Sequence, residues 1–318
     1  MSVTHIPVLR EEVLTYLNPK SGGLYVDATI GLGGHSLSIL KKSAPKGQLI
    51  GIDQDNLALS KCEKRLKVFK DRLRLIHGNF SDLQDLLKLH EVSKVDGILF
   101  DLGVSTLQLD TPERGFSFQH NGPLDMRMDQ QMPILALDIV NDSTAESLMK
   151  IFREYGEERY AKLIAQRVVA SRSVEPITTT QQLTQIVESV IPGKSKNRKR
   201  DFHQRRIHPA TRVFQALRIV VNDELKNLKC AIDAAVSVLK KDGCLCMISF
   251  HSLEDRIVKQ KFQFYAKTCI CSPKAPICVC NHQQKLKVIT KRPILTSASE
   301  IDVNPRSRSA KMRVAVRV

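Results

Sequence analysis

The chain has 318 residues, of which 42% are hydrophobic, and this content is enough for a substantial core and excludes disorder throughout. No apolar run approaches the roughly 20 residues that a helix needs to cross a bilayer. The formal net charge of +16 favours a polyanionic partner such as nucleic acid, because many Lys and Arg residues cluster between Lys194 and Arg206.

The first hundred residues alternate between short apolar runs and amphipathic segments, which is typical of an α/β fold. We predict strands at Leu24 to Ala28, Gln48 to Asp53, Leu73 to His77 and Val95 to Asp101. Helices are expected between them, at Gly34 to Ser43, Asp55 to Phe69 and Ser81 to His90. Asp55 and Ser81 are predicted to be the N-caps of the last two helices.

After Asp101 the alternation stops, and turn-rich strings are followed by helical patterns without strands. The patterns predict helices at Ser143 to Tyr155, Glu157 to Arg172 and Thr179 to Ser189. The α/β pattern then returns with one long helix at Pro209 to Lys240, a strand at Cys244 to Phe250, and final strands at Leu286 to Lys291 and Lys311 to Val318. We therefore expect a discontinuous sheet domain, residues 1–107 and 209–318, with an inserted helical domain at 108–208 for substrate recognition.

A glycine turn, Gly31-Leu32-Gly33-Gly34-His35, lies between the first predicted strand and the first helix. Glycines let the backbone approach a ligand closely, and a helix N-terminus offers unpaired N–H donors. Asp53 ends the second strand about 20 residues further on, the spacing of an acid that binds a ribose diol. The pattern predicts a nucleoside cofactor, although an ordinary turn without a ligand stays an alternative because a lone glycine motif is weak evidence.

Two classes of cofactor fit this turn. A dinucleotide fingerprint needs a third glycine at position 36, which is Ser36 here. Asp27, just before the turn, would repel a pyrophosphate but could pair with the ammonium group of S-adenosylmethionine (SAM). We therefore favour SAM over NAD.

Nine distinctive strings follow one another along almost the whole chain: His5-Ile6-Pro7-Val8-Leu9, Gly31-Leu32-Gly33-Gly34-His35-Ser36, Asp101-Leu102-Gly103-Val104-Ser105, Glu113-Arg114-Gly115-Phe116-Ser117-Phe118, Gly122-Pro123-Leu124-Asp125-Met126-Arg127-Met128, Tyr155-Gly156-Glu157-Glu158-Arg159, His208-Pro209-Ala210-Thr211-Arg212, Ile248-Ser249-Phe250-His251-Ser252-Leu253-Glu254-Asp255-Arg256 and Asn304-Pro305-Arg306-Ser307-Arg308-Ser309. In these strings the chain resembles the bacterial 16S rRNA (cytosine-N4)-methyltransferase family, RsmH (MraW). The resemblance implies a Rossmann-like class I SAM-dependent methyltransferase sheet. It also implies N4-methylation of a cytosine in the decoding region of 16S rRNA, on the small ribosomal subunit.

The resemblance also implies which residues bind SAM, by matching positions in the family's motifs. These residues are Gly33, Gly34, His35, Asp53, Phe80, Asp101 and Gln108. Their chemistry fits the assignment, because Asp53 can accept both ribose hydroxyls and Phe80 can stack near the adenine.

Asp101 is the candidate catalytic residue, with His251 as a second candidate for which a structural role is at least as plausible. Cytosine N4 is a poor nucleophile, so positioning and a hydrogen-bond acceptor for the amine should matter most. Many amino-methylating enzymes carry an Asp/Asn-Pro-Pro-aromatic tetrapeptide after the fourth strand. This chain has Asp101-Leu102-Gly103-Val104 instead, which leaves open whether Asp101 contacts the amine, the cofactor or both.

Two C-x-C pairs, Cys269 with Cys271 and Cys278 with Cys280, lie near the C-terminus. Four thiolates can hold zinc tetrahedrally. The spacing nevertheless differs from the common C-x-x-C form, so free thiols are favoured and no metal ligand is assigned.

Three other classes of protein stay open at this point. A non-catalytic ribosome-binding protein would explain the charge but not the cofactor residues, and a dinucleotide oxidoreductase would explain the sheet alone. A DNA methyltransferase fits both, and only the family resemblance favours rRNA. The N-terminal residues carry acids and lack the pattern of a signal peptide, so we expect a cytoplasmic protein; its oligomeric state, including a homodimer, stays open.

Overall fold

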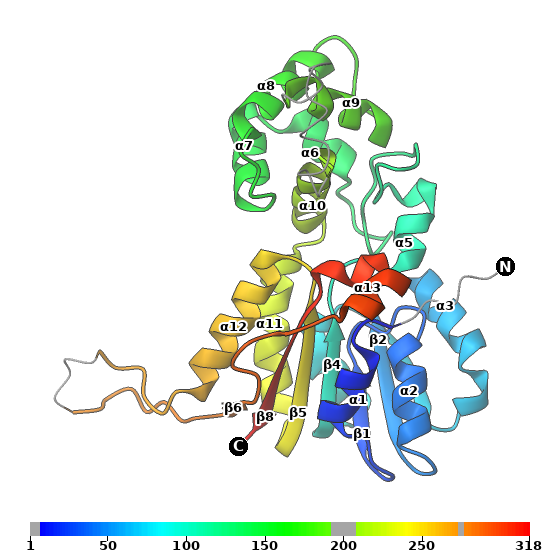
Figure 1. The fold of residues 1–318 in the computed structure, drawn as a ribbon, viewed down its shortest axis with the longest axis vertical. Helices are drawn as coiled ribbons and strands as arrows, with labels where there is room; N and C mark the ends of the chain where they lie inside the picture. The colour runs from blue at the N-terminus through cyan, green and yellow to red at the C-terminus, as the bar shows by residue number, and fades with distance from the viewer. Residues whose placement is uncertain (1–6, 192–207, 273–276) are drawn as a thin grey trace. The chain divides into compact units, whose positions relative to one another are not determined.

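The computed structural model describes residues 7–191, 208–272 and 277–318 (Figure 1). The chain divides into two compact units: a sheet unit of Met1–Gly103 and Leu225–Val318, and a helical unit of Val104–Glu224. The second boundary comes later in the chain than the expected division at residue 208. The reason is that helix α10 (Ala210–Val221) buries Val213, Phe214 and Leu217 in the core of the helical unit.

The sheet unit is built on one eight-stranded sheet with the order β3-β2-β1-β4-β5-β8-β6, and β7 pairs with β8. The strands are β1 (Leu24–Asp27), β2 (Gln48–Asp53), β3 (Leu73–His77), β4 (Val95–Asp101), β5 (Leu239–Ser249), β6 (Leu286–Val288), β7 (Ile294–Leu295) and β8 (Lys311–Arg317). Strands β1 to β5 run parallel to one another, whereas β8 runs antiparallel to β5, β6 and β7. The sheet is thus doubly wound with an antiparallel C-terminal strand.

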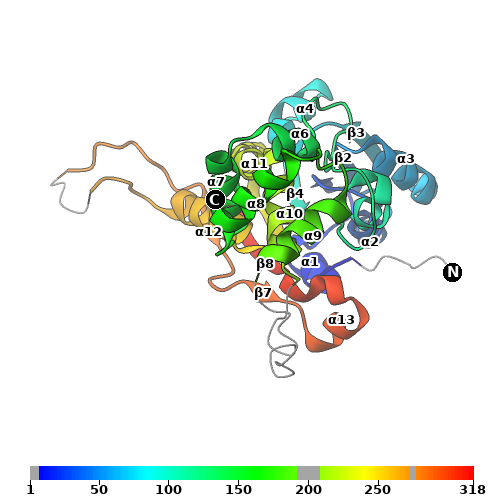
Figure 2. The same ribbon diagram turned by 90° about the horizontal axis from the view of Figure 1, so that it is seen from above.

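Helices cover both faces of this sheet (Figures 1 and 2). Helices α1 (Arg10–Leu17), α2 (Gly34–Lys42) and α3 (Asn56–Arg65) share a core with Leu49 of β2 and Leu99 of β4. Helices α4 (Leu83–Leu89), α11 (Glu224–Val238) and α12 (Ser252–Ala266) share the other core with Ile50 and Ile98. Successive strand residues therefore point into different cores, so the strands are apolar on both faces, as in parallel sheets generally.

The four predicted N-terminal strands are confirmed, although β1 ends one residue earlier than predicted. The predicted N-cap of α3 is also confirmed, because Asp55 accepts the Leu57 N–H at 3.0 Å.

The prediction that Ser81 is an N-cap is wrong. A 3-10 helix, η2 (Phe80–Asp82), precedes α4, and the Asn79 side chain caps it by accepting the Ser81 N–H at 2.9 Å. The capping side chain thus lies two residues earlier in the chain than expected.

The single long helix predicted at Pro209 to Lys240 is also wrong, because α10 and α11 are separate. Asp223 lies between them with φ of +50°, a left-handed conformation that ends α10. The Asn222 side chain donates to the carbonyls of Met126 and Arg218 and accepts the Met128 N–H, each at 2.8 Å. These tertiary hydrogen bonds replace the helical pattern at the break.

The helical unit contains α5 (Thr106–Asp110), the 3-10 helix η3 (Pro112–Arg114), α6 (Ala136–Asp142), α7 (Ala145–Glu154), α8 (Ala161–Arg172), α9 (Thr180–Val190) and α10. The three helices predicted here correspond to α7, α8 and α9, with ends shifted by a few residues, and α5 and α6 were not predicted. Their side chains share one core that includes Phe152, Ile164, Leu183 and Leu217. No helix among the described residues combines the length and apolarity needed to cross a membrane.

Candidate functional site

The sheet reverses its strand order at β1, which pairs with β2 on one side and β4 on the other. Ligands of doubly wound sheets bind at the carboxyl ends of the strands at such a point. The chain leaving β1 is held to both neighbours, since the Ala28 N–H donates to the Leu99 carbonyl at 2.9 Å and the Ile30 N–H to the Ile52 carbonyl at 3.0 Å. The glycine turn therefore has a fixed position at this edge.

The turn requires glycine for steric reasons. Gly31 and Gly33 have φ of +49° and +74°, a region that side chains disfavour. A Cβ on Gly33 would lie 2.8 Å from the Cys62 sulfur and 2.8 Å from Leu66 Cδ1. Gly33 is the N-cap of α2 and brings no capping side chain, so N–H groups of the first turn, which begins at Gly34, stay available for a ligand.

Asp53, at the end of β2, is held as a rigid acceptor. Its Oδ2 accepts the Gly31 N–H at 2.8 Å, and its Oδ1 accepts the Asp55 N–H at 2.9 Å. A carboxylate offers about four acceptor positions, so Asp53 can accept a further hydroxyl besides its backbone donors. Burial raises the pKa of Asp53 to about 6, although hydrogen bonds from the backbone of Asp55, Gly31 and Gln54 oppose this shift.

Asp27, at the end of β1, has a different role from the one expected. Its side chain is buried, with Oδ2 accepting the Ser36 hydroxyl at 2.7 Å and Oδ1 the Thr29 N–H at 3.4 Å. Burial raises the pKa of this carboxyl to about 6. Because Asp27 is only 1% exposed and fixes α2 to β1, the interpretation that it pairs with a ligand ammonium is wrong.

Asp101, at the end of β4, is the most unusual carboxyl of the sheet edge. Its backbone N–H donates to Thr29 Oγ1 at 2.6 Å, and its Oδ2 lies 3.7 Å from Nε2 of the buried His35. Its Oδ1 has no hydrogen-bond partner among the described residues, and the side chain is 21% exposed. Burial first, and then the charges of Asp27 and Glu254, raise the pKa of Asp101 to about 8.

A buried acceptor without a partner is unfavourable unless something else supplies a donor or a positive charge. Asp101 therefore has the properties expected of a residue that binds a cationic or N–H-bearing ligand. The hydroxyls of Thr29 and Ser36, which the sequence analysis did not single out, orient Asp101 and Asp27. Both residues could have been predicted from the sequence, because their hydroxyl side chains flank the glycine turn.

Phe80 follows β3 and begins η2. Its ring is partly exposed and packs edge-on against Phe100, with ring centroids 5.9 Å apart. The neighbouring Asn79 donates from Nδ2 to Gln54 Oε1 at 3.1 Å, which joins this segment to the residue after Asp53. An aromatic ring thus lies at the same sheet edge as the acceptor predicted for the ribose.

Two other predicted residues have structural roles. Gln108 belongs to the helical unit, where its Oε1 accepts the Ser105 N–H at 3.0 Å in a capping box that begins α5. His251 is the N-cap of α12, and its Nδ1 accepts the Glu254 N–H at 3.4 Å. The sheet unit therefore brings together Gly33, Gly34, His35, Asp53, Phe80 and Asp101, and the capping role of His251 favours Asp101 as the reactive group.

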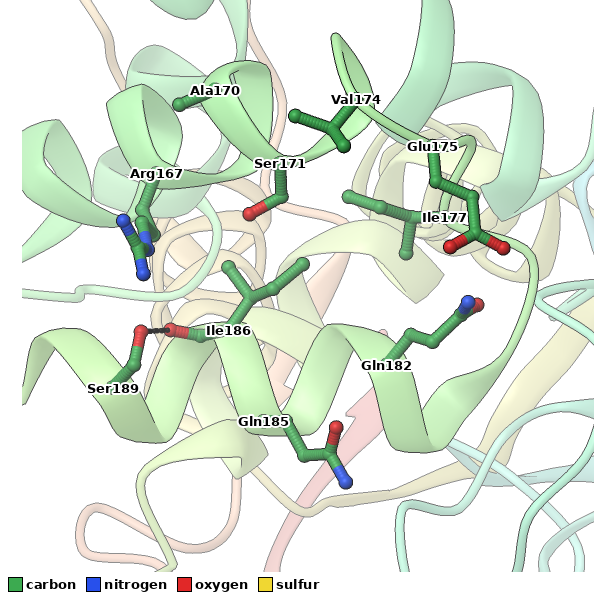
Figure 3. Close-up of a pocket in the computed structure, with 10 residues that line it drawn as sticks. All are labelled: Arg167, Ala170, Ser171, Val174, Glu175, Ile177, Gln182, Gln185, Ile186 and Ser189. Carbon is green, nitrogen blue, oxygen red and sulfur yellow. Dashed lines mark hydrogen bonds between the residues drawn. The ribbon is translucent and has the colours of Figure 1, made fainter.

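The helical unit has a cavity of its own, with a volume of about 510 Å³, between α8 and α9 (Figure 3). It is lined by Arg167, Ala170, Ser171, Val174, Glu175, Ile177, Gln182, Gln185, Ile186 and Ser189. The lining offers one cation and one carboxylate and has no glycine turn, so it lacks the features of a nucleoside-cofactor site. The basic segment from Lys194 to Arg206 lies outside the described residues.

The sheet is doubly wound and has a glycine turn at its switch point, a fixed acid after the second strand and, after the fourth, a carboxyl oxygen with no partner among the described residues. Together these features define an α/β enzyme that binds a nucleoside cofactor. The model of the MraW methylase family matches residues 2–318, and the chain belongs to this family. Its sheet is that of the class I SAM-dependent methyltransferases, and its cofactor is SAM.

Relatives match the chain over nearly its whole length. A ribosomal RNA small subunit methyltransferase H from Halothermothrix orenii is 49% identical over 314 residues, which cover 99% of this chain and 98% of the relative. Its counterpart from Trichlorobacter lovleyi is 50% identical over 311 residues, which cover 98% and 97%. Among solved structures, an rRNA methylase from Streptococcus thermophilus aligns with 97% of this chain and 93% of its own, at 10% identity and a TM-score of 0.39.

Proposed function

We propose that this chain transfers the methyl group of SAM to N4 of a cytosine in the decoding region of 16S rRNA, in the cytoplasm. The observation that carries the proposal is the Asp101 carboxyl, which ends β4 with one oxygen that has no partner among the described residues. Asp101 contacts residues on both sides of the glycine turn: its backbone N–H donates to the Thr29 hydroxyl, and its Oδ2 lies 3.7 Å from His35 Nε2. The small-subunit rRNA substrate is the one in the names of the sequence relatives.

The sheet edge matches the parts of SAM one by one. Asp53 would accept the ribose hydroxyls, Phe80 would pack against the adenine, and the turn at Gly33 and Gly34 would leave room for the methionine moiety. Asp101 would pair with its positive charge, and this pairing would favour the ionised carboxylate that burial opposes in the free protein. When bound, SAM supplies an electrophilic methyl group.

Asp101 would also serve the acceptor base. The lone pair of cytosine N4 is delocalised into the ring, and an acceptor that binds an amine hydrogen favours the pyramidal nitrogen that attacks. Asp101 Oδ1 is such an acceptor, and the Thr29 hydroxyl and the sheet hydrogen bonds of β4 hold it in place. Fixed geometry of this kind supplies most of the acceleration when the electrophile is already reactive.

We further propose that the helical unit and the basic segment from Lys194 to Arg206 recognise the RNA, and that the assembled small subunit is the preferred substrate. Clustered cations bind phosphates with a strong dependence on salt. In the sequence the segment lies between α9 and α10, and both helices belong to the helical unit. The target base must leave its stack, which makes the folded particle a plausible determinant of which cytosine is accessible.

The test is transfer of labelled methyl from SAM to small subunits from a strain that lacks the modification, with naked rRNA and DNA in parallel and the product nucleoside identified by mass spectrometry. N4-methylcytidine from the subunits supports the proposal. Transfer to DNA, or SAM binding without transfer to any RNA, contradicts the substrate while leaving the cofactor site intact.

A further inference from the structure

The segment that joins α12 to β6 extends away from the sheet (Figures 1 and 2) and carries two C-x-C pairs. Their four sulfurs converge, with every pair within 4.8 Å. Cys269 Sγ lies 3.4 Å from Cys278 Sγ and 3.7 Å from Cys280 Sγ. Cys278 Sγ lies 4.0 Å from Cys271 Sγ and 3.6 Å from Cys280 Sγ.

These sulfur–sulfur distances match those between the ligands of a tetrahedral metal site. A zinc ion bonds thiolate sulfur at about 2.3 Å, which places the sulfurs of a tetrahedral site roughly 3.8 Å apart. We propose that Cys269, Cys271, Cys278 and Cys280 bind one structural zinc ion. The sequence spacing alone favours free thiols, and the convergence of all four sulfurs is what reverses that preference.

The backbone supports the same conclusion independently. The N–H groups of Ile270, Cys271 and Val279 each donate to a cysteine sulfur at 3.4 Å. Thiolates bound to a metal carry negative charge, and N–H donors around them orient the ligands and stabilise that charge. Three such donors in one short segment indicate a loop that is shaped around thiolates.

The apolar side chains of the segment do not hold its shape. Ile270, Ile277 and Val279 are exposed, with Ile277 at 75% and Val279 at 79%, so the described residues here form no apolar core. Its base is tied to α12, where the Lys285 N–H donates to the Tyr265 carbonyl at 2.8 Å and His282 Nε2 lies 3.2 Å from the Phe264 carbonyl. Segments too small to bury a core generally need a metal or a disulfide.

Two disulfides are the obvious alternative, but their geometry differs. A disulfide brings two sulfurs to about 2.05 Å and leaves the pairs independent, whereas all eight cysteines here are free and four form a single cluster. Four soft thiolates in a tetrahedral arrangement select zinc among the abundant divalent ions. A zinc ion here would be structural, because four protein ligands leave no open position.

The test is the metal content of the full-length protein, purified without chelator and measured by elemental mass spectrometry. The expected result is about one zinc per chain, falling at least tenfold in a Cys269→Ser, Cys278→Ser double variant. Cys230→Ser is the matched control, because Cys230 is exposed but outside the cluster, and it should keep the zinc.

Thiol titration of the native protein gives a second readout that does not depend on a variant. Five cysteines are exposed or partly exposed, the four of the cluster and Cys230, and the other three are buried. Zinc-loaded protein should react rapidly at Cys230 alone, and chelation should release the four others. The proposal would be overturned if the protein held no zinc after incubation with excess zinc, or if five thiols still reacted while zinc was present. One iron per chain in place of zinc would also overturn it.

Discussion

Each unit has a buried polar cluster, and the pKa values of the aspartates are shifted in opposite directions in the two clusters. At the sheet edge, Asp27, Asp53 and Asp101 have raised pKa values, in each case mainly because of burial. In the helical unit, Asp125 makes a two-pronged pair with Arg127, with Nε to Oδ1 and Nη2 to Oδ2 both at 2.8 Å. The hydrogen bonds from Arg127 outweigh burial and lower the pKa of Asp125.

We propose that this difference separates residues that bind a ligand from residues that stabilise the fold. A carboxylate that has an internal cation is stable without any ligand. Carboxyls gathered without a cation oppose folding until a positively charged ligand binds. We therefore expect changes at Asp53 and Asp101 to reduce function with little loss of stability, and changes at the Asp125–Arg127 pair to do the reverse.

The largest effect is expected for Asp101→Asn. The variant keeps the shape of the side chain but loses the charge, and an NH2 donor replaces one of the two acceptor oxygens, so methyl transfer should fall about 100-fold or more. Its melting temperature should equal or exceed that of the wild type, because a buried like charge is removed. If the variant lost both activity and stability, Asp101 would be a structural residue, and the proposed difference between the two clusters would be wrong.

Asp53→Asn should weaken SAM binding about 10- to 100-fold, since hydrogen bonds to a charged acceptor contribute about 1.5–3 kcal/mol. Isothermal titration calorimetry would measure the dissociation constant. Asp85→Asn, on the exposed side of α4, is the control that loses the same charge without touching the site. Equal affinities in the two variants would remove Asp53 from the cofactor site.

Asp125→Asn should destabilise the protein by about 2 kcal/mol, because it leaves the Arg127 guanidinium partly buried without its carboxylate. Denaturant titration would report this loss. The SAM dissociation constant should stay within a factor of about two, since SAM is predicted to bind in the sheet unit and the two sites share no residues. A large loss of SAM affinity would show that the two clusters are coupled.

The two clusters should also respond to pH with opposite signs. The raised pKa values of the sheet-edge carboxyls stabilise the free protein below pH 4, and this contribution is lost as the pH rises through about 6 to 8. The lowered pKa of Asp125 contributes stability above its unfolded value, and this is lost as the pH falls through the folded value.

A cationic ligand favours the ionised carboxyls, so SAM affinity should rise roughly tenfold from pH 6 to pH 7.5 in the wild type, with net proton release on binding. Calorimetry in buffers of different ionisation enthalpy would measure the released protons. In Asp101→Asn the rise should be smaller. The same steep rise in that variant would mean that another group titrates.

The sheet strands were predictable because β1 to β4 are short apolar runs that end at polar or glycine residues. The break between α10 and α11 was not, because Asn222 and Asp223 are neither proline nor glycine. Their conformation depends on hydrogen bonds to Met126 and Met128, about 95 positions away in the chain. Helices α5 and α6 were missed because they are too short to show a periodic pattern.

For the candidate site, the spacing after the glycine turn predicted Asp53 and the family resemblance predicted Asp101, but neither shows how deeply each acid is buried. The sequence could not distinguish Asp27, whose oxygens are used internally, from Asp101, which keeps one oxygen without a partner in the described chain. The cysteine cluster shows the same limit, since spacing says little about how four sulfurs converge. Three-dimensional convergence is the information that the sequence pattern lacks.

The most direct test of the account is a crystal structure of the protein with bound SAM. We predict that the cofactor lies at the carboxyl ends of β1, β2 and β4, with its ribose hydroxyls within hydrogen-bond distance of Asp53 and its positive charge next to Asp101. A cofactor bound elsewhere, for example in the cavity between α8 and α9, would contradict the assignment of the sheet edge as the functional site.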